Sequence, residues 1–265
     1  MNIELKDISG TFPSEPCVFA ACDSKYFLDH ASPFCNSAHK ANMPCHVHIV
    51  NPSEEVLRQC EIYKQKISTP LTFTYNYMEI PEDSDAMKCT YASLRFFVLP
   101  HLLEKIEKIM VLDIDCMVMK NFIFPEKPCG LFVRQPVTYL TDWIREGTKI
   151  AAGIVYFDKS YIDKTKKLIE IINSLPKTWY ADQVALNKLL TEHINHEDVF
   201  VFNGNFMDWN FIEGTVIWTG KGKSKYDNPK YVAMKRAMAL VTFCNNRNLP
   251  TQHRSCFYTF FYQAS

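Results

Sequence analysis

Two aspartates follow directly on a short apolar segment in the middle of the chain. Residues 109–112 read IMVL, and Asp113, Ile114 and Asp115 come next. Such a run predicts a buried strand, and the ligands of doubly wound α/β sheets bind beyond the carboxyl ends of the strands. Mg²⁺ and Mn²⁺ take carboxylate oxygens as ligands and bridge readily to phosphates. The spacing therefore predicts a Mn²⁺ or Mg²⁺ site, held by Asp113 and Asp115, that binds a diphosphate.

Strand-like and helix-like segments alternate along the chain. Apolar runs predict strands at residues 17–22, 46–50, 71–75, 109–112, 131–134, 150–157 and 199–202. Helical spacing predicts helices up to about residue 39, from about residue 53, over residues 84–108 with a break near Pro100, and over residues 161–175 and 181–190. This alternation is typical of an α/β fold with a Rossmann-like, mostly parallel central sheet and helices on both faces. Because no repeat or low-complexity linker interrupts it, we expect a single domain over residues 1–265.

The composition argues against some classes of protein. The 265 residues suffice for a sizeable core, and the hydrophobic fraction of 47% is ordinary for a globular protein. Lysine and arginine together number 29, as do aspartate and glutamate, so the formal net charge is zero. Nucleic-acid binding usually requires a basic excess on one face, and we therefore expect no nucleic-acid partner.

The ten cysteines include no C-x-x-C pair, which argues against zinc ribbons and thioredoxin-like chemistry. Scattered cysteines in a chain of this length are typical of buried thiols in a reducing compartment. Residues 1–16 lack the apolar core of a signal peptide, and no apolar run approaches the roughly 20 residues of a membrane span. We therefore expect a cytoplasmic protein. The aromatic residues 257–262 (FYTFFY) would dock on the domain itself, join a partner in a homo-oligomer, or contact lipid.

The surroundings of Asp113 and Asp115 resemble glycosyltransferase family 8, which includes glycogenin, galactinol synthases and bacterial lipopolysaccharide galactosyltransferases. In that family an arginine and a leucine-proline helix end precede a strand and its metal-binding D-x-D, as Arg95 and Pro100 do here. Further blocks in the family's order are residues 20–26 (AACDSKY), 151–155 (AAGIV), 182–187 (DQVALN), 208–210 (DWN) and 218–223 (WTGKGK). The resemblance spans residues 17 to about 225 and implies a single catalytic domain of the GT-A fold. Its expected parts are a nucleotide-binding half at about residues 17–120, a donor-sugar and acceptor half at about 121–240, and the aromatic tail at 241–265.

The family's motifs imply a role for each matching residue. Those expected at the nucleobase are Ala21, Asp23 and Tyr26. Those expected at the donor sugar are Arg95, Ala152, Gly153, Asp182 and Gln183. Those expected at the diphosphate are Asp113, Ile114, Asp115, Gly220 and Lys223, where glycine lets the backbone approach and lysine supplies a point charge. The expected catalytic residues are Asp182, Gln183 and Asp208.

The resemblance implies a metal-dependent enzyme that transfers a sugar from a nucleotide-diphosphate donor, with UDP favoured, to a hydroxyl of a glycan or glycoconjugate. The metal and the lysine would stabilise charge on the departing diphosphate. The family retains the anomeric configuration, with assistance near the glutamine that Gln183 matches. An inverting enzyme instead needs a base opposite the leaving group, and Asp142, Asp182 and Asp208 are candidates for that base.

Two positions depart from the family's pattern. Ile217 stands where the family usually has a histidine as third metal ligand, and Ala151 replaces an asparagine at the sugar. Both changes suit an alternative, a degenerate module that binds a nucleotide sugar without turnover. A nucleotidyltransferase-like enzyme is a further alternative, but such enzymes usually show a glycine-rich, basic loop after the first strand. Residues 21–26 contain no glycine.

Several of these residues also have structural interpretations. Asp23 and Asp182 are suited to capping the helices that follow them, and the lysines of residues 221–225 to a solvated charge run. His46 and His48 alternate along a strand. Without a third ligand in view, we expect a structural role for these histidines rather than a metal site.

Overall fold

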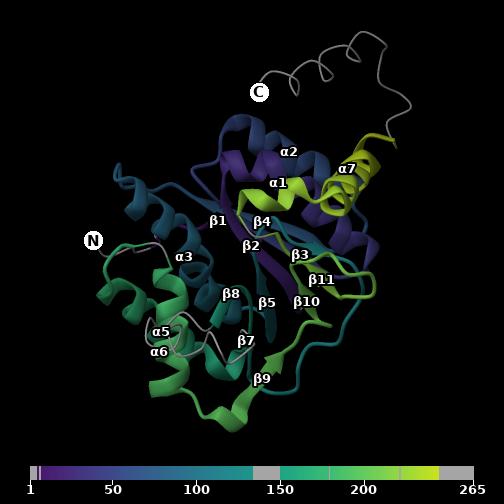
Figure 1. Ribbon diagram of the computed structural model, residues 1–265. Coiled ribbons are helices and arrows are strands. Elements are labelled where there is room, and N and C mark those ends of the chain that lie inside the picture. Colours follow the sequence, from purple (N-terminus) through teal and green to yellow (C-terminus); the bar gives the residue numbers. More distant parts are fainter. Residues whose placement is uncertain (1–4, 6, 134–149, 179, 221, 245–265) are drawn as a thin grey trace.

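An eight-stranded sheet forms the centre of the molecule (Figure 1). The computed structural model describes residues 5, 7–133, 150–178, 180–220 and 222–244. The strand order is β1-β4-β3-β2-β5-β8-β7-β9. In that order the strands are Ser9–Gly10, Leu71–Asn76, Cys45–Val50, Cys17–Asp23, Lys108–Leu112, Ile150–Asp158, Cys129–Val133 and Val199–Phe202. Every strand predicted from an apolar run is present.

The sheet is parallel from β4 through β5, and again between β7 and β9. Strand β8 runs antiparallel to both of its neighbours, and the short β1 runs antiparallel to β4. The prediction of a mostly parallel sheet is confirmed, with these two exceptions. Strands β2, β3 and β5 are buried along almost their whole length, as expected for strands covered on both faces.

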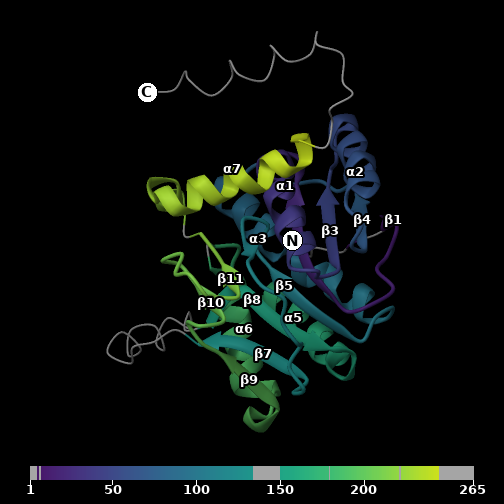
Figure 2. The same ribbon diagram turned by 90° about the vertical axis from the view of Figure 1, so that its right-hand side faces the viewer.

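Helices cover both faces of the sheet (Figures 1 and 2). They are α1 (Ser24–Lys40), α2 (Glu54–Lys66), α3 (Ser84–Leu103), α5 (Ile162–Ser174), α6 (Ala181–His193) and α7 (Pro229–Cys244), with the short 3-10 helices η2 (Lys159–Tyr161), η3 (His196–Asp198) and η4 (Lys223–Asp227). On one face α1 and α2 share a core with the sheet, and α7 packs on α1. On the other face α3, α5 and α6 form a second core with the sheet. Neighbouring residues of β2 serve the two cores in turn, since Val18 belongs to the first and Phe19 to the second.

Side chains at the ends of strands start the first two long helices. The carboxylate of Asp23 accepts the backbone N–H of Tyr26 at 2.7 Å, and the hydroxyl of Ser53 accepts that of Val56 at 3.3 Å. A side-chain cap of this kind stabilises a helix by about 1 kcal/mol. The capping interpretation of Asp23 is therefore confirmed.

The expected helix break near Pro100 is wrong. Pro100 lies inside α3, which continues to Leu103. The proline ring costs the helix a backbone hydrogen bond, but Leu99, Leu102 and Leu103 are completely buried around it. Burial of each leucine contributes roughly 2 kcal/mol, which offsets the cost of the proline.

A second, three-stranded sheet joins distant parts of the chain. Its strands are β10 (Met207–Asp208), β11 (Ile217–Trp218) and β6 (Met117–Val118), in that order. Strand β11 pairs antiparallel with β6, so that Trp218 lies opposite Met117. Because β6 comes almost directly after Asp115, this pairing brings the residues that follow Trp218 to the carboxyl end of β5.

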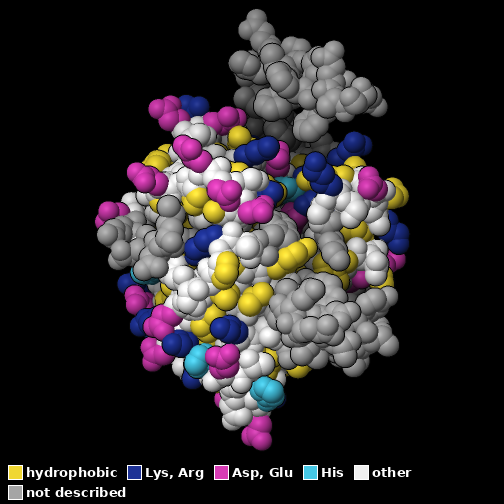
Figure 3. All heavy atoms as spheres, turned by 60° about the vertical axis from the view of Figure 1, so that its left-hand side comes forward, with side chains coloured by type: hydrophobic (Ala, Val, Ile, Leu, Met, Phe, Trp, Pro, Cys, Tyr) yellow, Lys and Arg dark blue, Asp and Glu magenta, His cyan; other side chains and the backbone are white. Residues whose placement is uncertain are grey.

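No helix in the described part of the chain is long and apolar enough to cross a membrane. The eight cysteines between residues 17 and 129 are free thiols, and all eight are buried, as the sequence predicts for this part of the chain. Basic and acidic side chains intermingle over the face shown in Figure 3, in keeping with the zero net charge. Asp142 and residues 257–262 lie outside the described residues.

Candidate functional site

Asp113 and Asp115 lie just beyond β5, where the sequence predicts them. The N–H of Asp113 donates to the carbonyl of Gly153 in β8 at 3.3 Å, and the N–H of Cys116 donates to the carbonyl of Asp113 at 3.0 Å. The hydroxyl of Tyr231 in α7 donates to the backbone carbonyl of Asp115 at 3.1 Å. Contacts with β8 and α7 therefore hold the turn that carries both carboxylates.

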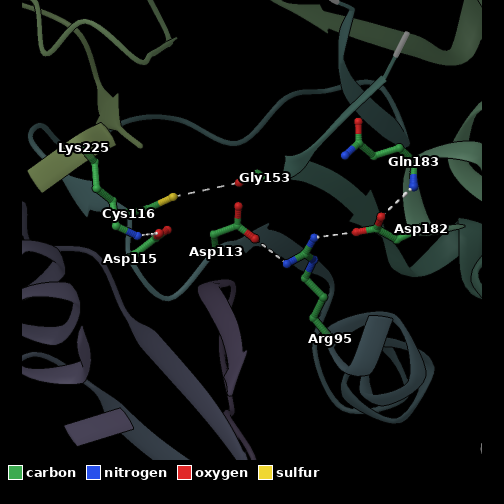
Figure 4. Close-up of polar contacts among 8 residues, drawn as sticks. All are labelled: Arg95, Asp113, Asp115, Cys116, Gly153, Asp182, Gln183 and Lys225. Carbon is green, nitrogen blue, oxygen red and sulfur yellow. Dashed lines mark hydrogen bonds and ion pairs between the residues drawn. The ribbon is translucent and has the colours of Figure 1, made fainter. Parts of the chain in front are cut away.

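Arg95 of α3 joins two of the predicted acids (Figure 4). Its Nη1 donates to Oδ1 of Asp113, and its Nη2 donates to Oδ2 of Asp182 at 3.0 Å. The side chains of Arg95 and Asp182 are only 9% and 6% exposed. Oδ1 of Asp182 accepts the backbone N–H of Gln183 at 2.8 Å. The guanidinium of Arg95 thus joins two predicted site acids from different segments, and the backbone of Gln183 adjoins the second of them.

Asp182 does not cap α6 as its structural interpretation expected. It lies in the first turn of the helix, and the N-cap position is taken by Tyr180. Its carboxylate is instead directed to Arg95, as Figure 4 shows. The contact with an arginine from another helix favours the site interpretation of Asp182 over the capping one.

Burial and mutual repulsion disfavour negative charge on these acids. Partial burial raises the pKa of Asp113, whose side chain is 35% exposed; Arg95 opposes the rise, and the nearby Asp115 carboxylate adds to it. Burial likewise raises the pKa of Asp182, with a contribution from Asp113 and opposition from Arg95. Additional positive charge at this position would favour the ionised carboxylates. The site is therefore suited to a cation.

Lys225 pairs with Asp115, a contact that the sequence does not indicate. Its Nζ donates to Oδ2 of Asp115, and the two side chains are 7% and 13% exposed. The family's motif favours Lys223 for the diphosphate, but Lys223 is exposed at the start of η4 whereas Lys225 is buried. The solvated interpretation is therefore wrong for Lys225. Lysines alternate in this segment, and nothing in their spacing distinguishes the buried one.

Two of the predicted glycines make room for the charged side chains. A Cβ at Gly153 would lie 2.8 Å from Oδ2 of Asp113, closer than real Cβ atoms come. A Cβ at Gly220 would overlap the side chain of Lys225. A side chain at Gly153 would have to displace the Asp113 carboxylate, and one at Gly220 would have to displace the whole stem of Lys225.

The residues predicted for the nucleobase lie on β2 and α1. Ala21 belongs to β2, and Asp23 ends this strand and caps α1. Tyr26 is 52% exposed, and its ring lies 5.6 Å from that of His30. Nε2 of His30 is 3.2 Å from the hydroxyl of Tyr226 in η4. A ring contact and a hydrogen bond thus connect the start of α1 to the segment that carries Lys225.

Asp208 has a structural role in the turn after β10. Its Oδ1 accepts the N–H of Asn210 at 3.0 Å, and its Oδ2 accepts the N–H of Ile212 at 2.7 Å. The residue is only 5% exposed. Because both oxygens are engaged by the backbone, this geometry argues against Asp208 as the base of an inverting reaction.

The two positions that depart from the family's pattern are packed in the core. Ile217 is 0% and Ala151 1% exposed, and both belong to the core shared with α1. Among the described residues, no group of three or more His, Cys, Asp or Glu side chains is placed to hold a metal. A cation at this site would therefore depend on Asp113 and Asp115. Within the described part of the chain, Oδ1 of Asp115 is buried without a hydrogen-bond partner, which leaves one carboxylate oxygen for a cation. Diphosphate and water would supply further ligands.

His46 and His48 form a buried polar chain with β4. Nδ1 and Nε2 of His46 lie 2.8 Å and 2.9 Å from the hydroxyls of Thr72 and Thr74. Nδ1 and Nε2 of His48 lie 3.0 Å from the same Thr74 hydroxyl and 2.9 Å from Oδ1 of Asn76. Because the Asn76 oxygen only accepts, every contact is satisfied when both histidines are neutral with hydrogen on Nε2. The predicted structural role of these histidines is confirmed.

No protein-family model and no curated protein sequence match the chain. Solved structures do match it. WbbM, a bifunctional glycosyltransferase, matches with a TM-score of 0.56 at 12% identity, over 93% of this chain and 53% of WbbM. The galactosyltransferase LgtC, in complex with donor and acceptor sugar analogues, matches with a TM-score of 0.55 at 15% identity, over 89% of this chain and 98% of LgtC.

The glycosyltransferase GlyE of Streptococcus pneumoniae matches with a TM-score of 0.54 at 14% identity, over 89% of this chain and 64% of GlyE. The chain therefore spans about half the length of WbbM and about two thirds of GlyE. At these identities the likeness is one of fold, and it confirms at that level the resemblance noted in the sequence. The chain has the GT-A fold of these glycosyltransferases.

Proposed function

We propose that the protein is a glycosyltransferase that moves a sugar from a nucleotide-diphosphate donor, with UDP favoured, to a hydroxyl of a glycan or glycoconjugate. The observation that carries the proposal is the meeting of Asp113, Asp115, Arg95 and Lys225 beyond the carboxyl end of β5. Ligands of such sheets bind at this edge. Two acids flanked by two basic side chains suit a diphosphate that is bridged to the protein by a cation.

Asp113 and Asp115 would hold Mn²⁺ or Mg²⁺, which supplies positive charge to the departing diphosphate. Lys223, exposed on η4, is expected to add a point charge to the same group. The exposed ring of Tyr26 offers a surface on which the nucleobase can stack. The donor would thus lie across the ends of β2 and β5, with its phosphates next to the acidic pair.

Arg95 and Asp182 would meet the donor sugar, with Gln183 next to the reacting carbon. Two of the three candidate bases for inversion are engaged elsewhere. Asp182 binds Arg95 and the N–H of Gln183, and Asp208 binds two backbone N–H groups. These contacts support a retaining reaction. The acceptor class is proposed from the likeness to LgtC, whose structure contains donor and acceptor sugar analogues.

Calorimetric titration with UDP and GDP, first with Mn²⁺ and then with EDTA, tests the proposal. We expect UDP to bind in Mn²⁺ and to lose affinity in EDTA, and UDP-sugars to be hydrolysed slowly. NMR of the released sugar would then show a retained anomer. If folded protein binds neither nucleotide, the proposal is wrong. If UDP binds but no UDP-sugar is hydrolysed or transferred, the chain is instead a nucleotide-sugar-binding module.

A further inference from the structure

The ion pair between Lys225 and Asp115 occupies one of the two carboxylates expected to bind a cation. Lys225 and Asp115 are 7% and 13% exposed, so both charges are largely removed from water. The ammonium of Lys225 donates to Oδ2 of Asp115 and so compensates the charge of that carboxylate.

The two residues of this ion pair differ in how firmly the surrounding structure holds them. Asp115 is fixed through its backbone carbonyl by Tyr231, and its turn is tied to β8. Lys225 lies on the short helix η4, which follows Gly222 at a φ of +55°. Its flexible side chain passes over Gly220, where a Cβ would block it. The lysine can therefore change its partner by rotation of its own side chain, while Asp115 stays in place.

The two oxygens of the Asp115 carboxylate differ. Oδ2 accepts from Lys225, whereas Oδ1 is buried and has no hydrogen-bond partner among the residues that the structure describes. A buried carboxylate oxygen that accepts no hydrogen bond destabilises the fold, so an ion pair with a purely structural role would be expected to satisfy it. A divalent cation could use that oxygen, but an ammonium on Oδ2 of the same carboxylate would repel it.

We propose that Lys225 is an exchangeable cation of the donor site. It neutralises Asp115 in the absence of donor, and it leaves Asp115 for a diphosphate oxygen when a divalent cation and the nucleotide bind. This inference rests on the proposed function and adds a residue outside the family's motif. Because Lys225 opposes the metal alone but favours the diphosphate, metal and nucleotide strengthen each other's binding.

The test measures the two affinities separately in the full chain. Free Mn²⁺ is followed by electron paramagnetic resonance without nucleotide, and UDP binding is followed by calorimetry in saturating Mn²⁺. The variants are Lys225→Met and, as a matched loss of one charge from an exposed position in α7, Lys230→Met. We expect Lys225→Met to bind Mn²⁺ about tenfold more tightly and UDP about tenfold more weakly than the parent chain. Lys230→Met should change neither affinity.

Opposite signs in the two measurements separate exchange from a structural ion pair. A structural ion pair predicts that both affinities fall together, and that result would overturn the inference, as would an unchanged Mn²⁺ affinity. Lys225→Gln, which keeps a polar side chain, is the second variant if Lys225→Met does not fold, and the same opposite shifts are expected. If the parent chain binds no UDP at all, the proposed function itself fails. If it binds UDP but the variants match it, only the exchange by Lys225 fails.

Discussion

Arg95 lies between two carboxylates that are far apart in the sequence, donating from one nitrogen to Asp113 and from another to Asp182. Asp182 lies 87 residues after Arg95 along the chain. A guanidinium can reach both acids at once because its N–H donors point in different directions from a planar group. A lysine ammonium is a compact point charge and cannot span the two carboxylates in this way. This bridge connects the end of β5 to the start of α6, and with them the expected metal and sugar parts of the site.

Removal of the bridge should destabilise the fold. Arg95→Met leaves Asp113 and Asp182 close together without a cation. We expect the free energy of unfolding to fall by about 3 kcal/mol. This value is near the lower end for a broken buried ion pair, because the Asp113 side chain is 35% exposed. Urea denaturation measures this. Arg58→Met is the control, since Arg58 is 70% exposed and its contact with Glu54 should contribute about 0.5 kcal/mol or less. Equal losses in both variants would contradict the bridge as a stabilising contact.

The acidic pair should be required for turnover and dispensable for folding. Asp113→Asn and Asp115→Asn keep the shape of the side chain and remove its charge, so a cation loses a ligand. We expect UDP-sugar hydrolysis to fall at least about a hundredfold, the size of effect seen when a group that stabilises developing charge is lost. Circular dichroism should remain that of the parent. Asp163→Asn, at a side chain that is 89% exposed, should keep full activity. If either site variant hydrolyses UDP-sugar at a near-normal rate with Mn²⁺ present, Asp113 and Asp115 do not form a metal site.

Gly153 should tolerate no side chain. The Cβ of Gly153→Ala would stand 2.8 Å from Oδ2 of Asp113 and displace that carboxylate. We expect UDP affinity in Mn²⁺ to fall about tenfold or more and stability to fall by about 1–3 kcal/mol. Gly204→Ala is the matched control, because a Cβ there meets nothing within 4 Å. If the two variants bind UDP equally well, the close approach of Gly153 to Asp113 has no bearing on the donor.

The buried histidines should make the protein sensitive to acid. Burial lowers the pKa of His46 to about 3 and that of His48 to about 4, from an ordinary value of 6.5. As the pH falls below about 6.5, both histidines become protonated in the unfolded chain but stay neutral in the folded chain. The free energy of unfolding therefore decreases as the pH falls. Between pH 6.5 and pH 5 each histidine should lower the free energy of unfolding by about 1.6 kcal/mol, because the slope rises from about 0.7 to about 1.4 kcal/mol per pH unit as the unfolded side chain becomes protonated.

Urea denaturation across this pH range checks the effect of the histidines. His46→Gln and His48→Gln replace a titrating side chain by a neutral one that still donates and accepts hydrogen bonds. Each variant should show a shallower dependence of unfolding free energy on pH, whatever its stability at neutral pH. A slope unchanged from that of the parent chain would show that these histidines are not its source.

The sequence by itself determined the seven longer strands of the central sheet, but not the two-residue strands β1, β6, β10 and β11. Apolar runs that are buried on both sides, such as residues 109–112, must lie inside the sheet, and the polar residues that follow must lie at its edge. Asp113 and Asp115 could therefore be placed beyond β5 from local pattern alone. The capping of α1 by Asp23 is equally local, because acceptor and donor are three residues apart.

Only the tertiary structure decided which charged groups meet. The apolar pattern of residues 150–157 predicts a strand but carries no direction, so the antiparallel course of β8 could not be read from it. Lys225 lies 110 residues from Asp115 in the sequence, and the pairing of β11 with β6 brings the two together. The spacing of the lysines does not show which of them is buried. The burial of Lys225 depends on Gly220 and on the position of η4 against the end of β5.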